Sequence, residues 1–157
     1  MEADRCLLLH HLRREVLSAR DRGRIVIEFA DGVPVTTLTE ARQMADGMIA
    51  LVNLPMLGPH WYPVDRARAA TILTEVLHWD LETLSARVPE QQARELTEKI
   101  LSQFPKDAYF LTNVRPTADL TDSPHRWASG SELAELDAGV AIVSQELVGL
   151  CWVEDRP

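Results

Sequence analysis

The residues of this chain best suited to acid–base chemistry are histidines that could share a cleft with a carboxylate. His60 lies in an irregular, proline-rich stretch, and His78 and Asp80 stand two positions apart. A histidine–carboxylate pair is the minimum for general acid–base catalysis. The spacing does not bring the three residues together, and no serine or cysteine beside them has the setting of a nucleophile. A small enzyme that uses His60, His78 and Asp80 is one hypothesis.

The sequence predicts neither a metal site nor a cofactor. His10 and His11 are adjacent, so on a helix they point about 100° apart and do not readily share a metal ion. The cysteines, Cys6 and Cys151, are far apart and belong to no CxxC or zinc-ligand pattern, which favours reduced, buried thiols over a disulfide. Glycine-rich phosphate loops are absent from the sequence.

Negative charge gives a second functional hypothesis. The net charge is -8, and residues 118–157 hold eight acids against Arg126 and Arg156, a net of -6. Nucleic acid requires a basic face and is therefore excluded as a partner, whereas a basic protein would be attracted. The alternative is that the charge serves solubility alone. The residues expected to bind a partner are five acids and one aromatic anchor: Glu154, Asp155, Glu146, Asp119, Asp122 and Trp61.

Two apolar runs near the end of the chain, 137–143 and 147–155, predict a buried β-hairpin. They are rich in β-branched and aromatic residues and are separated by a short polar turn. Apolar side chains fall on both parities, so we expect both faces of these strands to be covered. Gly139 and Gly149 would allow a neighbouring backbone or large side chain to approach closely. The aromatic stretch that contains Trp61 either lines a contact surface or closes one end of the core.

The remaining pattern predicts an α+β fold in one globular domain, 1–157. A small, mostly antiparallel sheet would carry about four helices, packed on one side. Helices are predicted over 2–22, 38–52, 66–79 and 89–104, and strands over 24–29, 33–35 and 108–113, with 24–29 and 33–35 joined as a hairpin by an Asp31-Gly32 turn. Because no apolar run approaches the roughly 20 residues needed to span a bilayer, and no secretory signal is recognised, a cytoplasmic location is expected.

Two stretches, 77–81 and 137–155, carry a resemblance. The segment Leu77-His78-Trp79-Asp80-Leu81 and the closing hairpin resemble small stand-alone bacterial proteins of unassigned activity, some of which are immunity proteins against toxins. The resemblance implies a non-enzymatic protein that neutralises a basic toxin by protein–protein contact. It assigns no role to a single residue. The alternatives are the small enzyme above and a homo-oligomeric subunit, such as a homodimer, whose apolar hairpin is completed by a neighbour.

Overall fold

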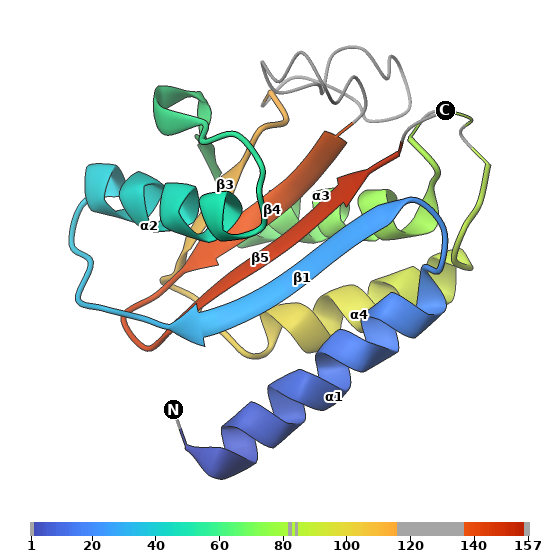
Figure 1. The fold of residues 1–157 in the computed structure, drawn as a ribbon, viewed down its shortest axis with the longest axis horizontal. Helices are drawn as coiled ribbons and strands as arrows, with labels where there is room; N and C mark the ends of the chain where they lie inside the picture. Colours follow the sequence, from blue (N-terminus) through green and yellow to red (C-terminus); the bar gives the residue numbers. More distant parts are fainter. Residues whose placement is uncertain (1, 82, 84, 116–136, 156–157) are drawn as a thin grey trace.

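The chain folds around one five-stranded antiparallel sheet (Figure 1). The computed structural model describes residues 2–81, 83, 85–115 and 137–155. Its strands stand in the order β1-β5-β4-β3-β2, so the last two strands of the chain lie inside the sheet. The strands are β1 (Arg24–Asp31), β2 (Tyr62–Val64), β3 (Tyr109–Thr112), β4 (Asp137–Val143) and β5 (Leu147–Glu154).

Local sequence signals set where two of the helices begin. Thr37 accepts a hydrogen bond from the Glu40 N–H at 3.2 Å, and Asp65 accepts one from the Arg68 N–H at 2.7 Å, as N-cap residues do. Among the described helices, none combines the length and apolar character needed to cross a bilayer. The helices are α1 (Ala3–Ala19), α2 (Leu38–Leu51), α3 (Arg66–His78) and α4 (Glu90–Leu101), with a short 3-10 helix, η1 (Gly58–His60).

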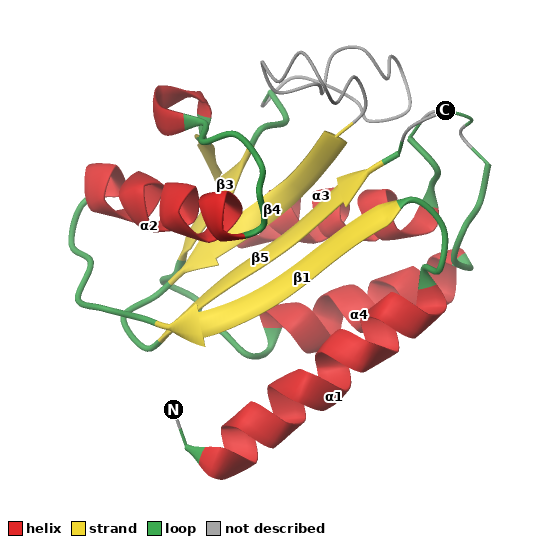
Figure 2. Cartoon of the chain, in the orientation of Figure 1, coloured by secondary structure: helices red, strands yellow, loops and turns green. Residues whose placement is uncertain are grey.

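The helices cover both faces of the sheet, which corrects the prediction that they would pack on one side. Apolar residues of α1, α3 and α4 form one core cluster with one face of the sheet. Those of α2 and the aromatic stretch form a second cluster against the opposite face (Figure 2). The predicted α+β fold class and the C-terminal hairpin are confirmed. Two cores on one sheet explain why strands β4 and β5 are apolar at consecutive positions.

The hairpin of β4 and β5 forms the centre of the sheet. Every residue of both strands is buried. Gly139 is required by close packing, because a Cβ atom there would lie 2.2 Å from the Cys151 carbonyl oxygen and 2.7 Å from the Trp152 ring. The hairpin is thus completed within its own chain, and the predicted role of a neighbouring subunit in completing it is wrong.

Strand β1 has a different partner from the predicted one. The sequence predicts a return strand at 33–35, but Asp31 pairs with Leu147 and the Gly32 N–H donates to the Glu146 carbonyl oxygen. Residues 33–35 form no strand. The long apolar strand β5 offers eight residues of pairing, which a short segment interrupted by Pro34 does not. This leaves β1 at one edge of the sheet.

Candidate functional site

The three residues of the acid–base hypothesis do not converge. The His78 Nδ1 atom lies 2.6 Å from the Val88 carbonyl oxygen, and Asp80 forms an ion pair with Arg87. His60 is exposed on η1, whereas His78 is the last residue of α3. In the described part of the chain, neither histidine has a hydrogen bond to Asp80. The hypothesis fails on geometry.

The two acids at the end of β5 lie in the interior, which corrects their predicted place on a partner-binding surface. Glu154 and Asp155 are each 2% exposed. Glu154 pairs with Arg24 at 2.8 Å, and Asp155 pairs with Arg20 at 2.5 Å. Both carboxylates are neutralised inside the protein, so neither is presented to a partner. Asp119 and Asp122 fall outside the described residues.

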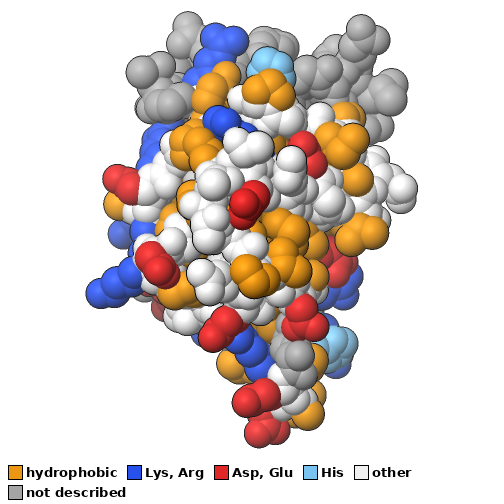
Figure 3. Space-filling model, turned by 90° about the vertical axis from the view of Figure 1, so that its left-hand side faces the viewer, with side chains coloured by type: hydrophobic (Ala, Val, Ile, Leu, Met, Phe, Trp, Pro, Cys, Tyr) orange, Lys and Arg blue, Asp and Glu red, His pale blue; other side chains and the backbone are white. Residues whose placement is uncertain are grey.

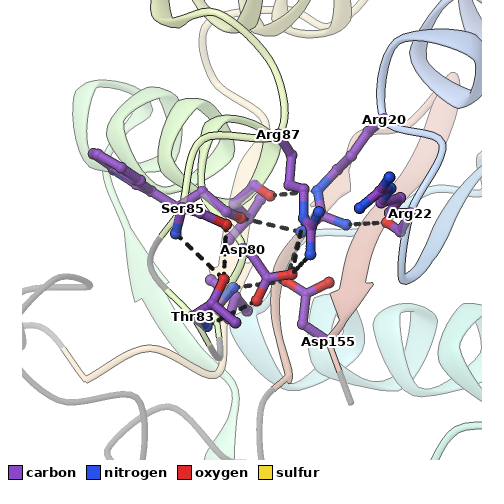
Figure 4. A network of polar contacts seen from close by, with 10 residues as sticks. Arg20, Arg22, Asp80, Thr83, Ser85, Arg87 and Asp155 are labelled. Atoms are coloured by element: carbon purple, nitrogen blue, oxygen red, sulfur yellow. Dashed lines mark hydrogen bonds and ion pairs between the residues drawn. The ribbon is translucent and has the colours of Figure 1, made fainter. Parts of the chain in front are cut away.

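Arg20 is the centre of this buried network (Figure 4). Its side chain is fully buried and donates to the carbonyl oxygens of Val76 at 3.0 Å, Arg22 at 2.8 Å and Trp79 at 3.1 Å. Two of these acceptors belong to the end of α3, where the last carbonyl groups of a helix lack intrahelical donors. The guanidinium therefore joins the ends of α1 and α3 to the end of β5. This is a structural clamp.

Asp80 accepts further hydrogen bonds of this network, in the loop between α3 and α4. Arg87 donates to its Oδ2 atom through both Nε and Nη2, and the Thr83 N–H donates to Oδ1 at 2.9 Å. The pKa of the Arg87 guanidinium is raised, chiefly by its hydrogen bond to Asp80. The contacts close the loop between α3 and α4 upon itself, as Figure 4 shows. Asp80 is thus a loop anchor in this structure.

Trp61 belongs to the core and does not provide an exposed anchor. Its side chain is fully buried and meets Trp152 edge to face at 5.7 Å between ring centroids. Its Nε1–H donates to Asp46 at 2.8 Å, and the same carboxylate accepts from the backbone N–H groups of Leu57 and Gly58. The aromatic stretch therefore closes the end of the second core, the alternative that the sequence left open.

Of the three predicted acids that lie within the described residues, only Glu146 is on the surface. Its side chain is 82% exposed in the turn between β4 and β5. It borders a groove of about 800 Å³ between this turn, the end of α4 and the chain leading to α2. The Arg5 Nη1 atom lies 3.5 Å from the Glu146 carboxylate, and its Nη2 donates to the Gln103 carbonyl oxygen. The groove is the candidate binding site.

The groove has an apolar floor and polar walls. Val35, Phe104 and Val143 lie buried beneath it, and Tyr109 is half-buried at its side. Its remaining lining residues are polar or exposed: Arg5, Thr36, Ser102, Gln103, Pro105, Asp107, Ser144, Gln145 and Glu146. An apolar base with hydrogen-bonding groups around it suits a protein segment that carries both kinds of side chain.

Acidic side chains surround this groove. Asp107 and Glu146 line it directly, whereas the acids Asp4, Asp31 and Glu40 stand where α1 begins, β1 ends and α2 begins, at the same end of the molecule. Figure 3 faces this end and shows acidic side chains spread over the surface. The end of the sheet opposite to Glu154 and Asp155 therefore carries several acids around the groove.

The sequence did not indicate that Asp107 and Tyr109 line this groove, or that Asp31, at the end of β1, lies at the same end of the molecule. Asp107 follows Pro105 in a turn, and Asp31 precedes Gly32, so both were recognisable as surface positions. Their convergence depends on the pairing of β1 with β5, which joins the first strand to the last. No local signal indicates that pairing.

The thiols and the metal-binding side chains provide no second site. Burial raises the pKa of Cys151 to about 12, although Arg20 opposes the shift, so this thiol stays neutral and unreactive. Cys6 is exposed on α1. Within the described residues, no three histidine, cysteine or acidic side chains gather as a metal ion would require.

Comparison with known proteins assigns no family. No family model, curated protein or solved structure matches the chain. The functional assignment therefore depends on the groove and its charge.

Proposed function

We propose that this is an acidic, non-enzymatic binding protein of the immunity type, which neutralises a basic protein by covering part of its surface. The observation that supports the proposal is the groove of about 800 Å³, which is lined by Asp107 and Glu146 and surrounded by further acids. The resemblance of 77–81 and 137–155 to proteins that include toxin-immunity proteins points in the same direction. The resemblance itself remains an expectation.

The proposed mechanism is electrostatic attraction followed by steric occlusion. Exposed acids would draw a basic partner toward this end of the molecule and speed its association. Contact with Tyr109 and the apolar floor would then slow dissociation, because buried aromatic contacts carry much of the free energy at interfaces. Arg5 has only a long contact, 3.5 Å, with Glu146 and would be exchanged for a cationic side chain of the partner.

A charge-reversal experiment tests the proposal. The protein and its Asp107→Lys/Glu146→Lys variant are each immobilised and exposed to lysate of the source organism, and retained proteins are identified by mass spectrometry. We expect the unmodified protein to retain a basic protein whose activity it inhibits in a purified assay. Reversal at the groove should weaken that binding by about tenfold or more, with a steep dependence on salt concentration.

The matched control is Glu95→Lys/Glu98→Lys. It makes the same change in net charge at exposed positions of α4, away from the groove. This variant should bind and inhibit as the unmodified protein does, apart from a modest general effect of net charge. Equal loss in both double variants would mean that net charge alone drives retention. A retained protein that is not basic, or that is bound without inhibition, would contradict the proposed function.

A further inference from the structure

We infer that the groove recognises a guanidinium group, which an arginine side chain of the partner would supply, and that Arg5 occupies the same place within the chain itself. The inference rests on the proposed function for the source of that arginine, whereas the chemistry of the site is argued from the groove alone. Arg5 is then an internal competitor of the partner and regulates access to the groove.

The first observation is that a guanidinium group already lies in the groove. Arg5 Nη2 donates to the Gln103 carbonyl oxygen at 3.1 Å, and Nη1 lies 3.5 Å from the Glu146 carboxylate. Two terminal nitrogens of one planar group therefore face acceptors on two different segments, the chain after α4 and the turn between β4 and β5. A planar fork of donors suits such a pair of acceptors better than the point charge of an ammonium group does.

The second observation is the negative potential at this place. Gln103 stands two residues beyond the end of α4, so the negative end of that helix dipole lies at the groove. The carboxylates of Asp107 and Glu146 line the same groove. Among the residues of the described chain that line it, Arg5 is the one with a permanent positive charge. The surroundings therefore favour a cation.

The third observation is that Arg5 is not placed to stabilise its own helix. It is the third residue of α1, in the first turn, where the positive end of the helix dipole disfavours a cation. Its side chain is 30% exposed, and its contact with Glu146 is long. These contacts are weak enough to be exchanged, and a cation from outside can then use the same acceptors.

The apolar part of the groove favours arginine over lysine as well. Phe104 forms part of the buried floor, and Tyr109 is half-buried at the side. Guanidinium groups stack on aromatic faces and are more weakly hydrated than ammonium groups, so they lose less on entering such a site. We therefore expect the partner to present an arginine beside an apolar residue.

The first test uses ethylguanidinium as the probe and ethylammonium as the matched control cation. Binding is followed by the NMR chemical shifts of the backbone amides of Gln103 and Glu146, with the amide of Glu95 on α4 as the reference. Arg5→Ala should bind ethylguanidinium about fivefold more tightly than the unmodified protein does, because one competing hydrogen bond is removed. Ethylammonium should bind severalfold more weakly, and Glu146→Gln in the Arg5→Ala background should remove most of the gain.

The second test uses the basic protein that the immobilised chain retains. Arg5→Ala should raise the association constant for that protein by about fivefold, whereas truncation of an ordinary contact residue would lower it. Arg14→Ala provides the control, because it makes the same change in net charge at an exposed position of the same helix, outside the groove. It should raise the association constant only slightly.

The inference and the proposed function fail on different results. If Arg5→Ala gains no affinity for ethylguanidinium, or binds ethylammonium equally well, the guanidinium site is overturned, even where a basic partner has been found. If Arg5→Ala weakens the binding of that partner, the role of Arg5 as a competitor is overturned. If ethylguanidinium binds as expected and no basic protein is retained, the guanidinium site is supported and the proposed function fails.

Discussion

Removal of the buried guanidinium at Arg20 provides the sharpest test of how the fold is held. In Arg20→Met the apolar stem is largely kept, but Asp155 loses its ion-pair partner and retains the Leu81 N–H as a donor, at 2.8 Å. The carbonyl oxygens of Val76 and Trp79 lose their donor as well. The contacts with Asp155 and Val76 lie in the interior, where water cannot readily replace the lost partner.

The expected loss of stability follows from these contacts. Leaving one member of a buried ion pair without its partner costs about 3–5 kcal/mol of unfolding free energy. Domains of this size are stabilised by about 5–15 kcal/mol, so the variant should unfold at a much lower urea concentration, with the m-value unchanged. Asp155→Asn in the Arg20→Met background should restore about 1–3 kcal/mol, because it removes the uncompensated charge.

Urea unfolding monitored by far-UV circular dichroism measures the effect, and Arg94→Met is the matched control. Arg94 pairs with Glu90 on the exposed face of α4, with side chains 63% and 59% exposed, so its loss should cost less than about 0.5 kcal/mol. Similar unfolding midpoints for Arg20→Met and Arg94→Met would refute the assignment of Arg20 as a clamp. An Asp155→Asn change that adds its own full cost to that of Arg20→Met would show that the two residues are not coupled.

Four further predictions concern hydrogen bonds, packing and thiols. Asp46→Ala should cost about 2–3 kcal/mol in chemical unfolding, because one carboxylate oxygen accepts three hydrogen bonds there; a cost near zero would mean that solvent replaces them. Gly139→Ala should cost about 3 kcal/mol in thermal unfolding, because the new methyl group would overlap its neighbours. Gly47→Ala has nothing within 4 Å of the new methyl group and should stabilise the helix by about 0.5–1 kcal/mol. Similar effects of the two changes would contradict the close packing at Gly139. Between pH 9.0 and about 12 the Cys151 thiol is ionised in the unfolded chain and neutral in the folded one. The free energy of unfolding should therefore fall as pH rises, by up to about 1.4 kcal/mol per pH unit. Cys151→Ala should flatten that slope. A thiol reagent at neutral pH should modify Cys6 rapidly and Cys151 only on unfolding.

Local features of this fold could be predicted from the sequence. Thr37 and Asp65 act as N-caps because capping needs only a side-chain oxygen and an N–H three residues later. The hairpin of β4 and β5 could be predicted because its strands are consecutive and joined by a short polar turn. The double coverage of that hairpin also followed from its apolar residues on both parities.

Features that depend on distant parts of the chain could not be predicted. The residues around Arg20 in the sequence are those of a solvent-exposed helix face. Its burial is evident only from the packing of α1, α3 and β5 in the structure. The same packing encloses Glu154 and Asp155, which the sequence placed on a surface because charge usually lies there. The groove could not be predicted for the same reason, since its walls come from segments about a hundred residues apart.

The pairing of β1 with β5 has a consequence for synthesis of the protein. Arg24 of β1 pairs with Glu154 of β5. Strand β1 therefore has no partner in the sheet until β5 has been synthesised. Contacts so distant in sequence slow folding, and the unpaired apolar segments are exposed to aggregation meanwhile. A chain that stops before residue 147 would lack a central strand of its sheet. We therefore expect the complete sheet to form only after β5 has been synthesised, and a chain truncated before residue 147 to yield no folded fragment.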